Sequence, residues 1–106
     1  MTDFIQIATT TATAEQAEQI AQALVTDRLA ACVQISSPIR SVYRWQGKVE
    51  QATEWLCVIK TRQTLFCTVE AKIRELHSYD CPEIVATPIV EGSEDYLAWL
   101  GEQLVE

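Results

Sequence analysis

The chain has 106 residues, of which 48% are hydrophobic and 22% are charged, and its formal net charge at pH 7 is −7. This length supports a single domain, residues 1–106, with no room for a second core. The 15 acidic and 8 basic side chains argue against binding to nucleic acid or to an anionic membrane surface, because both are recognised through clustered Lys and Arg. No apolar run approaches the roughly 18 residues of a membrane span, and no signal peptide is evident. We therefore expect a soluble, cytoplasmic protein.

The four cysteines, Cys32, Cys57, Cys67 and Cys81, form no CxxC pair. In a cytoplasmic protein they are expected to be free thiols, and neither a thioredoxin-like motif nor a zinc ribbon is indicated. Cys32 in LAACVQI and Cys57 in WLCVIKT have apolar neighbours. This setting predicts that both pack as small hydrophobic residues in the core.

The first part of the chain predicts a strand followed by a helix. Residues 3–9, DFIQIAT, alternate and contain β-branched side chains, which is typical of a strand. Thr13 and Gln16 match a capping box, in which both side chains satisfy free amide groups at the start of a helix. Apolar residues then recur at helical spacing, so the helix is expected to continue to about Leu29.

Residues 32–61 predict a β-hairpin. Gln46-Gly47 lies between two strand-like arms and forms a natural two-residue turn, because glycine supplies the positive φ that such turns require. Pro38 cannot donate a hydrogen bond to a neighbouring strand, so it predicts a kink or bulge in the first arm.

The arms of this hairpin exceed the typical strand length of about 5–6 residues. The part that extends beyond the sheet would expose three aromatic side chains, those of Tyr43, Trp45 and Trp55. An isolated extension of this kind is marginally stable and prone to aggregation. Pairing with another subunit removes the problem, so the hairpin predicts an obligate oligomer.

The remainder predicts a second helix, a last strand and a third helix. Apolar residues in 65–76 are spaced four, four and three apart, which places them on one helical face. Residues 83–90 predict a strand in which Pro88 suits an edge position, and Ser93 predicts the N-cap of the third helix. The order βαββαβ with an extra C-terminal helix favours an α+β, ferredoxin-like fold: an antiparallel four-stranded sheet with two helices on one face.

The segment HSYDCPEIVATPI begins at His77, the single histidine of the chain. His77 and Cys81 are four residues apart, but Pro82 disfavours a helical conformation at Cys81, so an i,i+4 chelate is not expected. His77 is then either a helix-terminal residue favoured by the helix dipole or a metal ligand. A zinc site needs three or four ligands. With Cys81, Asp80 and Glu83 as local donors, a complete site would borrow groups from a neighbouring subunit.

An enzyme that uses Cys81 as nucleophile and His77 as base is a further interpretation. Such a site needs an orienting third group and an oxyanion hole. The sequence contains no glycine-rich turn and no second histidine. We therefore expect no catalytic residues.

Two lysines of the hairpin, Lys48 and Lys60, and two of its aromatic residues are also candidate functional residues. Lys60 closes a strand, where its ammonium either pairs with Glu50 or Glu54 across the hairpin or extends to solvent. Tyr43 and Trp45 lie near the hairpin turn, and such aromatic residues are favoured as interface anchors over ligand stackers.

Five segments together resemble the CutA divalent-cation tolerance family. They are RLAACVQI (28–35), SVYRWQGKVE (41–50), WLCVIKT (55–61), HSYDCPEIVATPI (77–89) and DYLAWL (95–100). The resemblance covers nearly the whole chain in the same order. It implies a ferredoxin-like subunit in a homotrimer similar in outline to the PII signalling proteins, with the long hairpin paired between subunits.

The resemblance also implies a cytoplasmic, non-enzymatic protein linked to tolerance of copper and other divalent cations. The metal-binding histidine of the family falls on His77, and we add Cys81 and Glu83 as candidate ligands from the same segment. The positions around the family's intersubunit cleft fall on Tyr43, Trp45, Lys48, Lys60, Tyr79 and Pro82.

Two positions depart from the family pattern. Some members carry a cysteine on the first strand that has been interpreted as a copper ligand, whereas this chain has Ile7-Ala8-Thr9 there. Many members have proline after the histidine, whereas this chain has Ser78. The sequence therefore predicts a homotrimer that binds divalent cations, copper foremost, through His77 and its neighbours. The alternative is a PII-like regulatory trimer whose cleft takes a small molecule or a loop of a partner protein.

Overall fold

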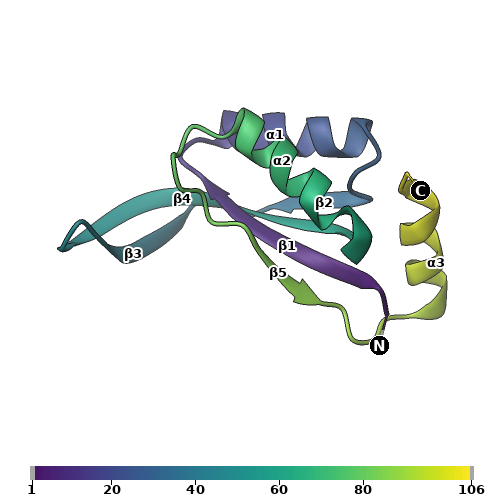
Figure 1. Cartoon of the computed structure of the whole chain (residues 1–106). Coiled ribbons are helices and arrows are strands. Elements are labelled where there is room, and N and C mark those ends of the chain that lie inside the picture. Colours follow the sequence, from purple (N-terminus) through teal and green to yellow (C-terminus); the bar gives the residue numbers. More distant parts are fainter. Residues whose placement is uncertain (1, 106) are drawn as a thin grey trace.

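A computed structural model describes residues 2–105, which form one antiparallel sheet with two helices on one face (Figure 1). In chain order the elements are β1 (Phe4–Thr11), α1 (Ala14–Thr26), β2 (Cys32–Ile35), β3 (Ile39–Trp45), β4 (Lys48–Arg62), a short 3-10 helix (Gln63–Leu65), α2 (Phe66–Leu76), β5 (Val85–Pro88) and α3 (Glu94–Gln103). The strand order is β2-β4-β1-β5, and β3 also pairs with β4. The predicted ferredoxin-like arrangement with an extra C-terminal helix is confirmed.

Strand β4 organises the sheet because it pairs along both of its edges. One edge pairs with β1 over residues 55–62. The other edge pairs with β3 over residues 48–54 and with β2 over residues 57–60. The predicted interruption at Pro38 is confirmed, since β2 and β3 are two parts of one arm separated at this residue.

The hairpin of β3 and β4 turns at Gln46 and Gly47, as predicted. Both residues have positive φ, 50° and 81°, which is the conformation of a type I′ turn. The hairpin extends well beyond the sheet (Figure 1). Tyr43 and Trp45 are exposed, as predicted. Trp55 is half-buried instead, because its part of β4 pairs with β1 inside the sheet.

Helix α1 ends at Thr26, three residues before the predicted end. Arg28 adopts a left-handed φ of 60°, and the amides of Arg28 and Leu29 donate to the carbonyls of Val25 and Leu24. These two hydrogen bonds form a Schellman motif, which usually has glycine at the left-handed position. Because arginine occupies it here, the sequence pattern gave no stop signal. Leu29 still packs in the core, beside Leu24.

The two predicted helix caps are only partly confirmed. Thr13 Oγ1 accepts the Gln16 amide at 3.1 Å, but the Gln16 side chain does not complete the capping box. It instead donates to the Leu76 carbonyl and accepts from the Ser78 hydroxyl, so it joins the start of α1 to the end of α2. Ser93 has the extended conformation of an N-cap, but its side chain makes no capping hydrogen bond.

The last strand is shorter than the predicted 83–90, since β5 pairs with β1 only over Val85–Pro88. Pro88 lies opposite Ile5 on an edge strand, where a missing amide proton costs no ladder hydrogen bond. Residues 83 and 84 belong to the irregular segment that follows α2.

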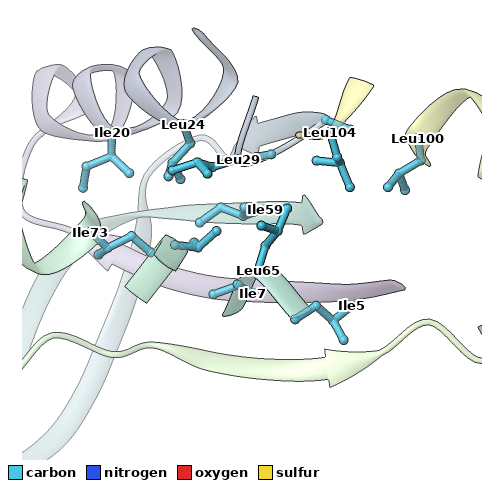
Figure 2. Packing of buried hydrophobic residues seen from close by; sticks show 13 residues of the cluster. Ile5, Ile7, Ile20, Leu24, Leu29, Ile59, Leu65, Ile73, Leu100 and Leu104 are labelled. Atoms are coloured by element: carbon cyan, nitrogen blue, oxygen red, sulfur yellow. The ribbon is translucent and has the colours of Figure 1, made fainter. Parts of the chain in front are cut away.

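The core lies between the sheet and helices α1 and α2, and α3 closes one end of it (Figure 2). Its fully buried large side chains are aliphatic residues of all these layers: Ile7, Ile20, Leu24, Ile59, Val69, Ile73 and Leu100. Cys57 is buried, as predicted, whereas Cys32 is only half-buried. No helix within residues 2–105 is long and apolar enough to cross a membrane.

Shortening Ile7 tests the importance of the central strand. We expect Ile7→Ala to lower the free energy of unfolding by about 2–5 kcal/mol, because the side chain is fully buried and leaves a cavity. Val25→Ala is the control, since Val25 is exposed and its shortening should cost less than about 0.5 kcal/mol. Urea denaturation of both variants at one protein concentration measures the difference. Equal losses would contradict the placement of Ile7 in the core.

Candidate functional site

A cleft of about 590 Å³ opens where the hairpin leaves the sheet. We call it the Tyr79 cleft. Its lining comes from β1, from β3, from β4 and from the irregular segment after α2: Thr10, Ser41, Val42, Tyr43, Trp45, Glu54, Tyr79, Asp80, Cys81 and Glu83. The cleft therefore lies at the base of the hairpin, where β3 and β4 leave the sheet. Cavities of this size are typical of small-ligand sites.

His77 ends helix α2 and fixes the segment that follows. Its backbone is extended, with φ −80° and ψ 142°. Its ring nitrogen Nε2 lies 2.7 Å from the Thr10 carbonyl oxygen, and Nδ1 accepts the Tyr79 amide at 3.1 Å. A carbonyl only accepts and an amide only donates, so Nε2 is the donating nitrogen and Nδ1 the accepting one in this arrangement. Both nitrogens are therefore occupied by backbone groups.

Tyr79 reaches from this turn into the cleft. Its ring lies 4.8 Å from the His77 ring, centroid to centroid, and its hydroxyl donates to Glu54 Oε2 at 2.8 Å. Glu54 is 7% exposed, although it lies on the hairpin strand. The pKa of Tyr79 is raised to about 12, chiefly by burial and in addition by the hydrogen bond and the negative charge of Glu54. The pair connects the α2 turn to β4.

The predicted metal ligands do not converge within one subunit. Cys81 and Glu83 line the cleft together with Asp80, whereas His77 lies outside the lining and has no free nitrogen lone pair. Within residues 2–105, no three His, Cys, Asp or Glu side chains are placed to hold one metal ion. A zinc ion needs three or four such ligands. The donor set of residues 2–105 therefore does not fit a resident metal.

The six predicted cleft residues fall into two groups. Tyr43, Trp45 and Tyr79 line the Tyr79 cleft. Lys48 lies beside the hairpin turn, opposite Trp45, and Pro82 is buried next to the cleft segment. Lys48, Lys60 and Pro82 do not line the cleft of a single subunit.

Lys60 contacts an aromatic residue of α3. Its ammonium lies 3.4 Å from the Tyr96 hydroxyl and 5.3 Å from the centroid of the Tyr96 ring. Of the two alternatives for Lys60, the pairing with Glu50 or Glu54 is not formed among residues 2–105, because Lys60 lies in the part of β4 that pairs with β1 and β2, whereas both glutamates precede it.

Sequence reasoning did not identify Glu54 as a cleft residue. A signal for it exists, because side chains of a strand alternate between faces. Glu54, Leu56 and Val58 share one face of β4. A carboxylate therefore lies on the same face of the strand as two apolar side chains. Such a residue is expected to find a hydrogen-bond partner. The partner, Tyr79, is 25 residues away and could not be assigned from spacing.

Residues 5–103 match the family model described as CutA1 divalent ion tolerance protein. The chain belongs to this family. A divalent-cation tolerance protein CutA from Thermus thermophilus is 49% identical over 88 residues, which cover 83% of this chain and 85% of that protein. The corresponding protein of Archaeoglobus fulgidus is 43% identical over 102 residues, covering 96% and 97%. The CutA relationship predicted from the five segments is confirmed.

Solved CutA structures show the same fold. The Cut A1 structure from Thermus thermophilus matches with a TM-score of 0.94 at 43% identity and covers 96% of this chain and 99% of that chain. A CutA1 structure from Oryza sativa matches with a TM-score of 0.96 at 37% identity, covering 99% and 96%. The family names refer to tolerance of divalent cations.

The Tyr79–Glu54 pair can be tested by titration. We expect Glu54→Gln to lower the pKa of Tyr79 from about 12 towards its ordinary value of 10, because the negative charge is removed while burial persists. The absorbance of tyrosinate near 295 nm measures the change, and Tyr79→Phe identifies which transition belongs to Tyr79. An unchanged transition in Glu54→Gln would contradict the contact.

The same pair predicts a loss of stability at high pH. The pKa of Tyr79 is higher in the folded chain, about 12, than its ordinary 10. Its contribution is therefore fully present below pH 10 and is lost as the pH rises towards 12. Between pH 10 and pH 12, the free energy of unfolding measured by denaturation should fall more steeply with pH for the unsubstituted protein than for Tyr79→Phe. The same dependence of the unfolding free energy on pH in both proteins would contradict the raised pKa of Tyr79.

Proposed function

We propose that this protein is a non-enzymatic homotrimer that supports tolerance of divalent cations by binding a ligand in the Tyr79 cleft. The names of its relatives support the link to divalent cations. The placement of the cleft supports a binding role, because it lies between the core and a hairpin available to a neighbouring subunit. In this respect the protein would act as a PII-like regulator, in which ligand binding changes the contacts between subunits.

The observation that carries the trimer proposal is the combination of a projecting hairpin and an open sheet face (Figure 1). Val42 and Val49 on the hairpin are each 65% exposed. The face of the sheet opposite α1 and α2 presents Ala8 and Val58, because their neighbours Ile7 and Ile59 point into the core. Ala8 and Val58 are half-buried, and exposed apolar patches mark protein interfaces.

The trimer also accounts for the residues left outside the cleft of one subunit. Lys48 lies at the hairpin tip and Lys60 lies at the other end of β4. In a homotrimer with hairpins paired between subunits, such residues are brought towards a neighbour's cleft. We propose that Lys48, Lys60 and Pro82 contribute to the intersubunit cleft in this way.

Direct copper binding is the second candidate function. It is favoured by the thiol of Cys81, which lies in the same cleft as Asp80 and Glu83, since thiolates suit copper. His77 could join these groups only by releasing the Tyr79 amide from Nδ1. Further donors would come from a neighbouring subunit. Such a site would be weak, because its ligands are not preorganised in one chain.

We propose a cytoplasmic location. All four cysteines are free thiols, which suits a reducing compartment. The relatives show that the family occurs elsewhere too, since one from Arabidopsis thaliana is named chloroplastic and the Archaeoglobus fulgidus structure is described as periplasmic.

The assembly is tested by light scattering. We expect a mass of three times the 11.9 kDa subunit at micromolar concentration. Val42→Asp combined with Val49→Asp should yield smaller species, because charged groups would be buried at the hairpin interface. Val25→Asp is the matched control, since Val25 is an exposed valine on α1, and it should stay trimeric. A monomeric unsubstituted protein would overturn the trimer.

Calorimetric titration with Cu(II) and Zn(II) tests the metal candidate. If the cleft groups bind copper, Cys81→Ala should weaken Cu(II) binding by about tenfold or more. His77→Ala should have little effect, because both ring nitrogens are bonded to the backbone. A comparable loss in His77→Ala would instead show that the ring acts as a ligand. Unchanged binding in both variants would remove the metal site from this segment.

A further inference from the structure

Helix α3 is attached to the rest of the subunit at a few points. It lies at the end of the sheet opposite the hairpin, apart from α1 and α2 (Figure 1). Within residues 94–105 the buried side chains are those of Leu100 and Leu104, which close the end of the core (Figure 2). An element held by little buried apolar surface belongs to the less stable part of a fold. The remaining attachments of α3 are made by two arginines and one lysine.

Arg28 fastens the C-terminal end of α3. Its Nε donates to the Gln103 carbonyl at 2.9 Å, and its Nη2 donates to the Glu102 carbonyl at 2.8 Å. Its own carbonyl accepts the Val105 amide at 2.8 Å. A guanidinium on the last carbonyls of a helix also suits the negative end of the helix dipole. Arg28 holds this clamp with a φ of 60°, a left-handed conformation that costs free energy in a residue with a Cβ.

Arg62 contacts the middle of α3 and is left incompletely satisfied. A Cβ on Gly101 would lie 3.1 Å from Arg62 Nη2 and 3.3 Å from Phe4 Cζ, so the helix backbone packs directly on both side chains. Arg62 Nε is buried and has no hydrogen-bond partner among residues 2–105. The Asp3 carboxylate lies 3.6 Å from it, which is beyond hydrogen-bond distance. A buried donor without a partner is unfavourable, so docking of α3 has a cost that water would relieve.

Tyr96 connects α3 to a lysine on the open face of the sheet. Lys60 Nζ lies 3.4 Å from the Tyr96 hydroxyl and 5.3 Å from the centroid of its ring, which combines a hydrogen bond with a cation–π contact. Lys60 shares a face of β4 with Val58, and this is the face assigned above to the subunit interface. An ammonium has three N–H donors. Donors therefore remain for a neighbouring subunit while Tyr96 holds the side chain in place.

We propose that α3 is a strap that detaches as a unit while the sheet stays folded, and that the docked strap positions Lys60 for the neighbouring subunit through Tyr96. Detachment removes the hydrogen bond and the cation–π contact that orient the ammonium. Because coupling is reciprocal, a neighbour that binds the oriented Lys60 also favours the docked strap. The proposal rests on the intersubunit role proposed above for Lys60 and adds its regulation.

Native-state hydrogen exchange of the full-length protein tests for the detachment. After correction for intrinsic rates, we expect the amides of residues 97–103 to exchange about tenfold faster or more than the paired amides of β1 and β4. Their exchange should also depend less on urea, because a local opening exposes less surface than global unfolding does. Equal protection and equal urea dependence in α3 and β4 would overturn the proposal.

Arg28→Gly isolates the clamp at the end of α3. Glycine adopts the left-handed conformation readily, so the backbone path is kept while both guanidinium hydrogen bonds are lost. We expect the α3 amides to exchange about tenfold faster, as the loss of charge-assisted hydrogen bonds implies, with β4 unchanged. Arg74→Ala, on the exposed surface of α2, is the control and should leave α3 unchanged. Equal acceleration in β4 and α3 would mean that α3 does not detach separately.

Lys60→Met tests the link between the strap and the lysine. Methionine keeps most of the apolar stem but removes the charge, so exchange of the α3 amides should become about threefold faster, as the loss of a cation–π contact implies. Lys48→Met is the matched control, because Lys48 belongs to the same strand but lies at the hairpin tip. Equal α3 exchange in the two variants would contradict the positioning of Lys60 by Tyr96.

Light scattering on the same samples distinguishes this inference from the assembly on which it rests. A trimer whose α3 amides exchange only with global unfolding would overturn the strap and leave the proposed assembly intact. A monomer whose α3 amides exchange locally, with the expected responses to Arg28→Gly and Lys60→Met, would support the strap and overturn the assembly.

Discussion

The pairing of β4 along both edges is the constraint on which the rest of the molecule depends. Cys57, Ile59 and Thr61 of this strand are buried, and residues 48–54 form one arm of the projecting hairpin. Because the strand is continuous, its register in the core also fixes the position of the hairpin. Glu54 lies at the transition, so the cleft is placed by the same pairing that holds the sheet together.

The turn after α2 gives a physical role to its histidine. The imidazole of His77 joins the Thr10 carbonyl of β1 to the Tyr79 amide, and Tyr79 in turn bonds Glu54. Three segments distant in sequence are thereby connected by neutral and charged hydrogen bonds of ordinary length. His77 is of a residue type that suggests metal binding. Its presence can instead be explained by its hydrogen bonds to backbone groups that would otherwise lack partners.

Periodicity and turn chemistry were sufficient to predict most of the fold. Alternation in β1, helical spacing in α2 and the Gln46-Gly47 turn are local signals, and each corresponds to an element of the structure. The end of α1 was missed because Arg28 occupies a position where glycine is usual. The site was only partly predictable, because the bond between Glu54 and Tyr79 joins residues whose proximity depends on the tertiary fold.

The topology also has a consequence for the order of folding. The hairpin closes through a two-residue turn and can form within about 1–10 μs, whereas β1 must find a partner strand some fifty residues away. The nascent chain therefore presents the apolar hairpin before the central strand completes the sheet. During that interval Val42 and Val49 are available to other chains. Because this surface forms early, it leads either to pairing with other copies of the chain or to kinetically trapped chains. The concentration of newly synthesised chains decides between the two outcomes.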